Sequence, residues 1–159
     1  MLCTCLWRHC AGGGGGGGGG EIGEGGARRA RYAALVKLAK RVGVMFIATA
    51  DDADDQLETM LMAMMRGAGP RGLRGVRVRR PLEGGRERGK ATVMLVRPMV
   101  AAAIERGDVE RVCRLAGWEW AVDATNADVS RLRAAVRARV VPVVKSIRKD
   151  SAQRACVTA

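Results

Sequence analysis

The stretch DDADDQLETMLMAMMRG, residues 51–67, carries the clearest helix signal in the chain. Aspartates gather at its start, where negative charge stabilises the positive end of a helix dipole. Thr49 and Asp52 have the spacing of a capping box, so the helix is expected to begin between them. Its apolar side chains recur at helical spacing and form one stripe: Leu57, Met60, Leu61 and Met64. The stretch therefore predicts an amphipathic helix that ends at Gly67.

The residues on either side of this helix predict a second helix and two short strands. Residues 27–42 have helical periodicity and are followed by Gly43. The run 44–49 then favours a buried strand, with continuation of the helix as the alternative. Residues 92–96 favour another buried strand, or a helix start, that ends at Pro98.

The C-terminal third is helical by pattern. Residues 99–106 and 108–116 predict two helices, with a turn at residues 106–108. A stripe with spacings of three and four predicts a further helix: Val129, Leu132, Val136, Val140, Val143 and Ile147. Pro142 falls inside this stripe and lacks a backbone N–H, so a kink or a break into two helices is expected there.

These elements indicate a mainly α-helical protein, a small helical domain with one or two short strands. The composition divides the chain into four parts. Residues 1–26 are expected to be a disordered Cys- and Gly-rich tail, 27–66 an amphipathic helical segment, 67–90 an exposed Arg- and Gly-rich loop, and 91–159 a helical segment. A short edge hairpin within the loop is the alternative for part of it.

The positive charge is concentrated in one part of the chain. The net charge is +12, and residues 66–97 hold ten basic and two acidic residues, which gives 10 − 2 = +8. Concentrated Arg on flexible backbone favours a polyanionic partner such as nucleic acid. The alternative is a solvated loop whose charge reflects GC-rich codons, since Arg outnumbers Lys 23 to 5.

The candidate nucleic-acid-binding residues all lie in this basic loop. Flexible Arg pairs with phosphates in a sequence-independent, salt-sensitive way. No aromatic residue lies between Phe46 and Trp118, so the loop itself offers no platform for stacking bases. The candidates are Arg71, Arg74, Arg77, Arg79, Arg80, Arg86, Arg88 and Lys90.

The sequence contains one weak internal repeat with a spacing of 32 residues, in which pairs of small residues recur on two segments of helical pattern. Ala103-Ile104 aligns with Ala135-Val136, and the first unit continues through Gly107-Asp108, Glu110, Val112 and Leu115, with Val122-Asp123-Ala124 in the following loop. A second unit contains Leu132, Val143-Val144-Lys145 and Ile147 but has Arg139 at the turn and Pro142 in a helix. Residues 98–147 thus resemble ankyrin repeats, which implies stacked helix hairpins that bind other proteins and carry no catalytic residues.

Two clusters of ionisable side chains were considered for chemistry. The DDxxD spacing of Asp51, Asp52 and Asp55 resembles the metal–diphosphate site of prenyl synthases. Stabilisation of the helix dipole explains the same aspartates with fewer assumptions. The other cluster could bind zinc or remain a free, oxidisable terminus: Cys3, Cys5, His9 and Cys10. His9 is the single histidine, which argues against nucleophilic hydrolysis by the usual route. No catalytic residue, no metal ligand and no cofactor is therefore predicted.

The sequence favours a non-enzymatic binding protein whose basic loop contacts nucleic acid or another polyanion non-specifically. A protein–protein interaction scaffold built on ankyrin-like helices is the alternative, with another protein as partner. A chain without independent function is the third. No apolar run is long enough to span a membrane, and the start lacks the features of a secretory signal. An intracellular location is expected by default.

Overall fold

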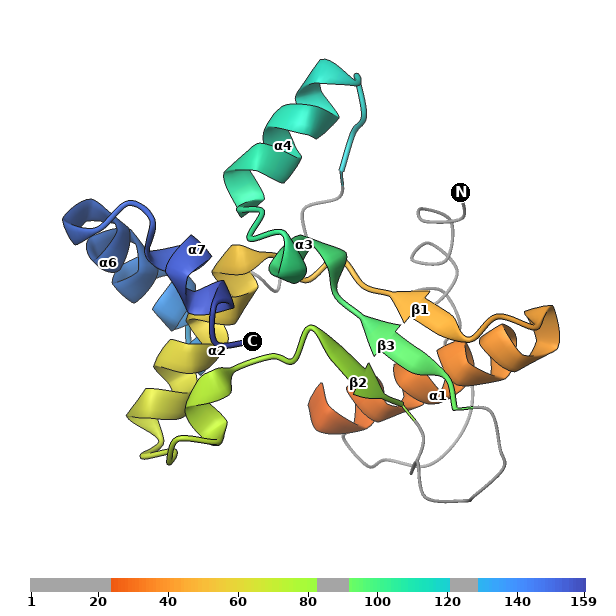
Figure 1. Cartoon of the computed structure of the whole chain (residues 1–159). Coiled ribbons are helices and arrows are strands. Elements are labelled where there is room, and N and C mark those ends of the chain that lie inside the picture. The colour runs from red at the N-terminus through yellow and green to blue at the C-terminus, as the bar shows by residue number, and fades with distance from the viewer. Residues whose placement is uncertain (1–23, 83–91, 121–128) are drawn as a thin grey trace. The chain divides into compact units, whose positions relative to one another are not determined.

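The computed structural model describes residues 24–82, 92–120 and 129–159 (Figure 1). The chain divides into two compact units, residues 1–34 and 35–159. In order, the elements are α1 (Glu24–Val42), β1 (Phe46–Ala48), α2 (Ala53–Met65), η1 (Gly72–Arg74), β2 (Arg79–Pro81), β3 (Met94–Val96), α3 (Pro98–Ala101), α4 (Arg106–Leu115), α5 (Leu132–Ala135), η3 (Val136–Val140), α6 (Val141–Ile147) and α7 (Ser151–Cys156). The described part is mainly helical with one small sheet, as the sequence predicts at that level.

The described part of the first unit is the beginning of α1. Here Arg28 Nη2 donates to the hydroxyl of Tyr32 at 3.3 Å, one helical turn further on. The Arg28 guanidinium also lies over the Tyr32 ring, 5.3 Å from its centroid. These contacts join neighbouring turns of the same helix.

A three-stranded sheet lies in the second unit, with the order β1-β3-β2. β1 pairs with β3 in parallel, with Phe46 opposite Met94, and β2 pairs with β3 antiparallel, with Arg79 opposite Val96. Pro81 is tolerated in β2 because an edge strand has one side that needs no donor. Both strands predicted from apolar runs are confirmed, and the third lies in the segment expected to be a loop.

One face of the sheet packs against the second half of α1. Val36 and Ala39 of this helix are buried together with Val93, and Ile47 and Leu82 pack against them. Because side chains alternate along a strand, Ile47 and its partner Leu95 share this face. Phe46 and Met94 therefore lie on the opposite face.

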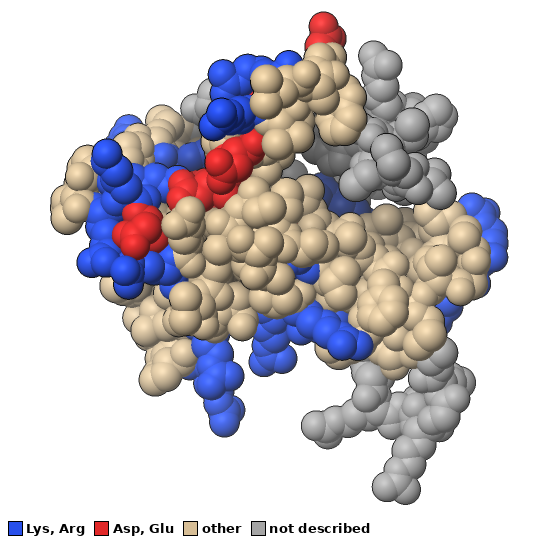
Figure 2. Space-filling view, turned by 45° about the horizontal axis from the view of Figure 1, so that its top comes forward, with Lys and Arg blue, Asp and Glu red and all other residues tan. Residues whose placement is uncertain are grey.

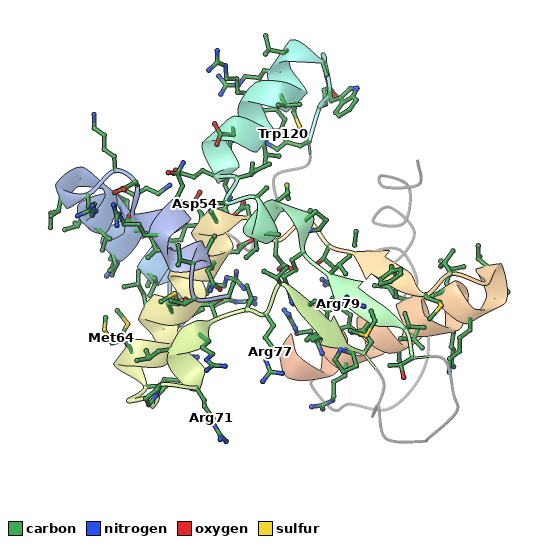
Figure 3. The ribbon with its side chains drawn as sticks, viewed as in Figure 1. Asp54, Met64, Arg71, Arg77, Arg79 and Trp120 are labelled. Atoms are coloured by element: carbon green, nitrogen blue, oxygen red, sulfur yellow. The ribbon has the colours of Figure 1, made fainter. Side chains whose placement is uncertain are left out.

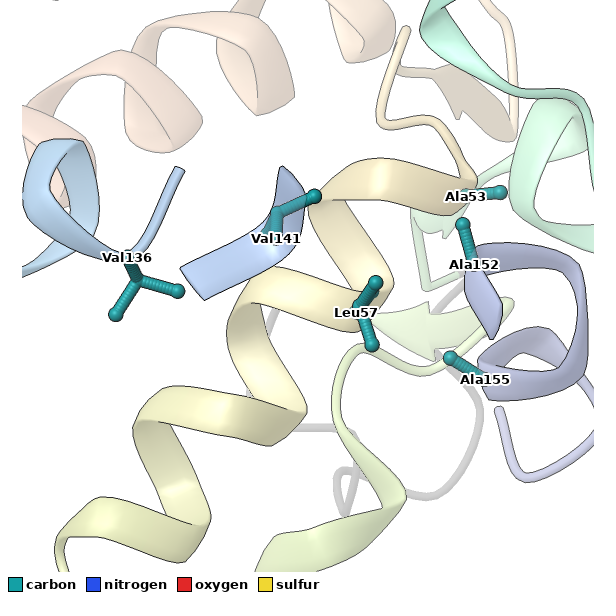
Figure 4. Packing of buried hydrophobic residues seen from close by; sticks show 6 residues of the cluster. All are labelled: Ala53, Leu57, Val136, Val141, Ala152 and Ala155. Carbon is teal, nitrogen blue, oxygen red and sulfur yellow. The ribbon is translucent and has the colours of Figure 1, made fainter. Parts of the chain in front are cut away.

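The larger apolar core forms around α2 and the C-terminal helices (Figure 4). Its buried members are Ala53, Leu57, Val136, Val141, Ala152 and Ala155. α2 begins with a capping box one turn later than expected: the Asp52 side chain accepts from Asp55 N at 2.8 Å, and the Asp55 side chain accepts from Asp52 N at 3.2 Å. Met64, expected in the buried stripe, is instead 61% exposed, so the stripe is buried only over the first turns of the helix.

The helical chain continues through Pro142, and a π-helical segment precedes it. α5 runs into the π-helical segment η3 and then into α6, which has Pro142 in its first turn. In π-helix the bonding partners lie five residues apart, which brings Val136 and Val141 to one face, and both are buried. Val143 and Ile147, expected in the buried stripe, are 56% and 83% exposed for the same reason.

The ankyrin resemblance is wrong. α3 ends at Ala101, and Ala103 has a φ of 52°, in the left-handed region, so Ala103-Ile104 lies in the link before α4. Its counterpart Ala135-Val136 lies inside a continuous helix. The two segments aligned by the 32-residue repeat therefore have different structures. The expected turn at residues 106–108 is likewise wrong, since it forms the first turn of α4.

Several predictions stay untested. The four-part division of the chain remains a prediction, and most of the expected N-terminal tail, with its Cys and His cluster, lies outside the described residues. None of the helices in the described ranges has the length and apolar character needed to span a bilayer.

Candidate nucleic-acid interface

A buried glutamine on α2 fixes the backbone of the basic segment, which we define as residues 71–80. Gln56 is fully buried, and its Nε2 donates to the carbonyl of Arg74 at 2.8 Å. Its Oε1 accepts from Val76 N at 2.7 Å. Nε2 also donates to the carbonyl of Ala155 at 3.2 Å, which links the segment to α7. One side chain thus bonds three backbone groups, of which the Ala155 carbonyl is fully buried and would be costly to leave unpaired.

A buried arginine holds the other end of the same segment. Arg97 follows β3 and is 2% exposed. Its Nη1 donates to the carbonyl of Arg77 at 2.6 Å, and its backbone N donates to the carbonyl of Val78 at 2.9 Å. Its Nε pairs with Asp51 at 2.6 Å, so the buried charge is balanced. The expectation of a long exposed loop is therefore corrected over residues 71–81: the backbone is anchored, and only side chains are exposed.

The anchored segment presents its arginines to solvent. Arg71, Arg74, Arg77 and Arg79 are exposed. Figure 3 shows Arg71 and Arg77 projecting away from the ribbon. Among the described residues, Arg71, Arg74 and Arg77 have no ion-pair partner, so their charge is available to an external anion. Arg80 is only half-buried and has interactions of its own. Arg86, Arg88 and Lys90 lie outside the described residues.

An aromatic ring joins the basic segment through the sheet, although none is near it in sequence. The Arg79 guanidinium on β2 lies 5.6 Å from the centroid of the Phe46 ring on β1. Such a distance is within the range of a cation–π contact. No aromatic residue neighbours the basic residues in the sequence, as predicted, but the fold brings the Phe46 ring next to Arg79.

The remaining basic residues near α2 are engaged in an ion-pair network. Arg137 Nε donates to Glu58 Oε1 at 2.6 Å, and Arg133 Nε donates to Glu58 Oε2 at 2.9 Å. Arg106 Nη2 lies 3.2 Å from Asp55 Oδ1, and Lys145 contacts Asp54. The full network consists of Asp52, Asp54, Asp55, Glu58, Glu105, Arg106, Arg133, Arg137 and Lys145. In Figure 2 the acidic atoms of this face gather beside basic ones, whereas other basic side chains have no acidic neighbour in view.

The network shifts the pKa of each buried carboxyl according to its partners. Burial acts to raise the pKa of Glu58, but hydrogen bonds from Arg137 and Arg133 outweigh it and lower that pKa. Burial is likewise outweighed at Asp54, whose pKa is lowered by its bond with Lys145. Burial and the nearby charge of Asp55 instead raise the pKa of Asp52 to about 6. Glu58 and Asp54 therefore act as fixed anions that hold the C-terminal helices against α2.

A comparison with known protein families matches residues 14–144 of this chain to the PP-loop domain. The match covers more than half of the chain. This chain belongs to the PP-loop family.

Several curated relatives of this PP-loop chain carry the same name. This chain is 38% identical over 112 residues to the tRNA(Ile)-lysidine synthase of Alkalilimnicola ehrlichii, and the match covers 68% of the chain and 22% of the relative. It is 40% identical over 103 residues to the synthase of the same name from Salinispora tropica, covering 65% and 28%. For Vibrio campbellii the identity is 38% over 96 residues, covering 60% and 19%. The chain thus spans between about a fifth and just over a quarter of the length of these relatives.

The PP-loop match corrects the expected function. The relatives are named as synthases, which are enzymes, so the expectation of a non-enzymatic binding protein is wrong. The ankyrin-like interaction scaffold is overturned by the same finding. The chain is instead a PP-loop protein whose relatives are named tRNA(Ile)-lysidine synthase.

The PP-loop family implies ATP, whose phosphates need a site rich in hydrogen-bond donors and positive charge. A helix N-terminus with free N–H groups is the usual anion site. At α2 this end is closed by the capping box of Asp52 and Asp55, and Asp54 and Glu58 add negative charge. Within residues 24–82, 92–120 and 129–159, no group of three or more His, Cys, Asp or Glu is arranged to hold a metal ion. The N-terminus of α2 in this PP-loop domain therefore does not fit a magnesium-bound triphosphate.

Sequence reasoning missed the residues that organise the interface, Gln56, Arg97 and Phe46. One signal was available for Gln56, because it stands beside the predicted apolar stripe of α2, where a polar side chain needs a buried partner. Arg97 directly follows a buried strand, which also favours burial. No local signal pairs Phe46 with Arg79, because their contact depends on the strand order.

Proposed function

We propose that this chain is the part of an ATP-using, tRNA-modifying enzyme, of the tRNA(Ile)-lysidine synthase kind, that contacts the tRNA backbone through Arg71, Arg74 and Arg77. The observation that carries this proposal is the combination of an anchored backbone with three exposed guanidinium groups that have no ion-pair partner among the described residues. Family membership and the names of the relatives support tRNA as the polyanion.

The anchoring matters for the strength of the contact. A flexible Arg-rich loop loses conformational entropy when it binds, and that loss weakens the complex. Here Gln56 and Arg97 have already fixed the carbonyls of Arg74 and Arg77 in the free chain. The guanidinium groups then pair with phosphates and displace the counterions condensed on the RNA. The segment therefore positions the tRNA, while sequence discrimination needs further contacts.

The other predicted contacts follow the three arginines in the sequence. Arg79 and Arg80 belong to β2, and Arg86, Arg88 and Lys90 follow within ten residues. We retain all five as proposed tRNA contacts. ATP would supply the chemical activation that a synthase of this kind requires, and the residues described here bind and orient the RNA.

The proposal is tested by tRNA(Ile) binding measured by fluorescence anisotropy over a range of salt concentrations. One variant replaces the three unpaired arginines with Gln: Arg71, Arg74 and Arg77. A control removes the same number of positive charges at exposed positions elsewhere: Arg111, Arg139 and Lys149. We expect the first variant to bind at least ~10-fold more weakly and to lower the slope of log K against log salt by about two to three, one unit for each lost phosphate contact. Equal weakening in both variants would show that only net charge matters and would refute the proposal.

A further inference from the structure

The first turn of α4 is closed to an external anion by the chain's own carboxylates. Asp108 Oδ2 accepts from Glu105 N at 3.3 Å. Asp54 Oδ2, which comes from α2, accepts from Arg106 N at 2.9 Å. A phosphate at a helix N-terminus binds through these same backbone N–H groups of the first turn. A phosphate at α4 would therefore have to displace carboxylates that already satisfy its donors.

The first turn of α2 is closed in the same way. Asp55 N donates to Asp52 Oδ1 at 2.8 Å, and Asp52 N donates to Asp55 Oδ2 at 3.2 Å. Ala53 N donates to the Ile104 carbonyl at 2.8 Å. The positive end of the helix dipole, which would attract a phosphate, is thus offset by fixed negative charge.

The basic side chains near α2 do not reverse this charge. The ion-pair network around α2 contains four basic and five acidic side chains, which gives 4 − 5 = −1. The pKa values of Asp54 and Glu58 are lowered by hydrogen bonds from Lys145 and Arg137 that outweigh burial, so both carboxyls stay ionised at neutral pH. Each cation of the network already has a carboxylate partner, and a triphosphate there would meet net negative charge.

The sequence ahead of α2 has the glycines of a phosphate loop without its other groups. Such loops combine glycine with a lysine that reaches the phosphates and a hydroxyl that ligates Mg²⁺. The glycine run of residues 12–20 is followed by Glu21, and α1 begins at Glu24. Residues 1–36 contain no Lys, and residues 5–48 contain no Ser or Thr. Carboxylates thus follow the glycines where a phosphate loop needs cationic and hydroxyl groups.

We propose that this chain binds tRNA without binding ATP, and that other residues of the enzyme hold the triphosphate. The inference rests on the proposed function, because tRNA is the ligand assigned to the basic segment. Arg71, Arg74 and Arg77 are spread over seven residues, and counterion release grows with the number of phosphates contacted, so the segment favours a long polyanion over one nucleotide. Coupling between two ligands is reciprocal, so a chain that does not bind ATP binds tRNA equally well with and without it.

The test uses the full chain and two binding assays. Isothermal titration calorimetry measures the binding of MgATP up to about 1 mM, the upper end of ordinary enzyme KM values. Inorganic tripolyphosphate with Mg²⁺ is the matched probe without a base. Fluorescence anisotropy measures tRNA(Ile) binding with and without MgATP at constant ionic strength. The variant in which Arg71, Arg74 and Arg77 are replaced with Gln is titrated in parallel.

We expect MgATP to give no saturable heat up to about 1 mM, and the Kd for tRNA(Ile) to change by less than about twofold when MgATP is added. Weak heat that tripolyphosphate reproduces and the arginine variant loses would also support the inference, because it reports only the charge of the basic segment. MgATP binding that saturates below about 1 mM, exceeds that of tripolyphosphate and persists in the arginine variant would overturn it. A tRNA affinity that depends on MgATP would overturn it as well.

The two proposals fail in different ways. If tRNA(Ile) binds through the basic segment and MgATP also saturates, the inference is wrong and the tRNA contact stands. If the chain is folded by circular dichroism and does not bind tRNA(Ile), the proposed function fails. The inference then fails with it, because it assigns tRNA to this chain.

Discussion

Replacing Gln56 with Leu tests whether this one side chain orders the basic segment. The substitution keeps a similar volume and removes three hydrogen bonds, to Arg74 and Ala155 carbonyls and from Val76 N. At a net value of about 1 kcal/mol for each bond, the expected loss of unfolding free energy is about 3 kcal/mol. Gln153→Leu is the control, because Gln153 is exposed on α7.

Two assays read this loss at different scales. Urea unfolding followed by circular dichroism measures the global free energy of unfolding. Limited trypsin digestion measures local opening, because cleavage after Arg71, Arg74 and Arg77 tracks the open population of the segment. If all of the loss falls on local opening, 3 kcal/mol corresponds to about 150-fold faster cleavage. Equal cleavage rates in the Gln56 and Gln153 variants would refute the anchoring role, whatever the global stability shows.

Three further predictions concern stability. The pKa of Asp52 is raised to about 6 from 3.8, so its contribution to the unfolding free energy falls as pH rises from about 4 to 6, while Asp54 and Glu58, whose pKa values are lowered, contribute in the opposite direction. Comparison of wild type with Asp52→Asn, which preserves the cap, isolates the contribution of Asp52: the variant should gain about 1–3 kcal/mol relative to wild type between pH 4 and pH 7, as measured by urea titration at both pH values. Gly75→Ala should lower the free energy of unfolding by more than ~1 kcal/mol, because Gly75 has a φ of +69° and a Cβ there would lie 2.8 Å from Gln56 Cδ. In the control Gly69→Ala the added Cβ meets no atom within 4 Å, so this variant should be near neutral in the same urea titration. Ser151→Ala should be neutral or stabilising by up to ~1 kcal/mol, because the Ser151 hydroxyl is buried without a partner among the described residues, and a lower thermal midpoint would contradict this.

The parts of the fold that depend on local patterns were predictable. α2 has its acidic start and apolar stripe within one stretch of chain, and the strands β1 and β3 coincide with short apolar runs. The sequence predicts the cap one turn too early, because Thr49 forms other hydrogen bonds: its N donates to the Val96 carbonyl at 3.0 Å, and its hydroxyl donates to Asp51 at 2.6 Å. Thr49 thus extends the ladder of β1, and Asp52 takes the cap.

The parts that depend on distant partners were not predictable from composition. The Gly- and Arg-rich segment has no helical period and little apolar surface, which favours an exposed loop. Its order comes from Gln56, 18 residues before Arg74, and from Arg97, 20 residues after Arg77. The same limit applies to the π-helical segment, because its register is set where Val136 and Val141 both reach the core around α2.

The number of basic residues in a segment of the sequence also does not show which of them are available to bind a polyanion. The C-terminal helices carry many basic residues, yet Arg133 and Arg137 both pair with Glu58, which is buried, and Lys145 pairs with Asp54. A paired, partly desolvated cation adds little to the potential outside the protein, because its field is cancelled at short range by its partner. Arg71 and Arg77 have no such partner among the described residues and stand on an anchored backbone. The electrostatic footprint for RNA therefore lies in the basic segment, because the acidic start of α2 has already taken up the arginines of the C-terminal helices.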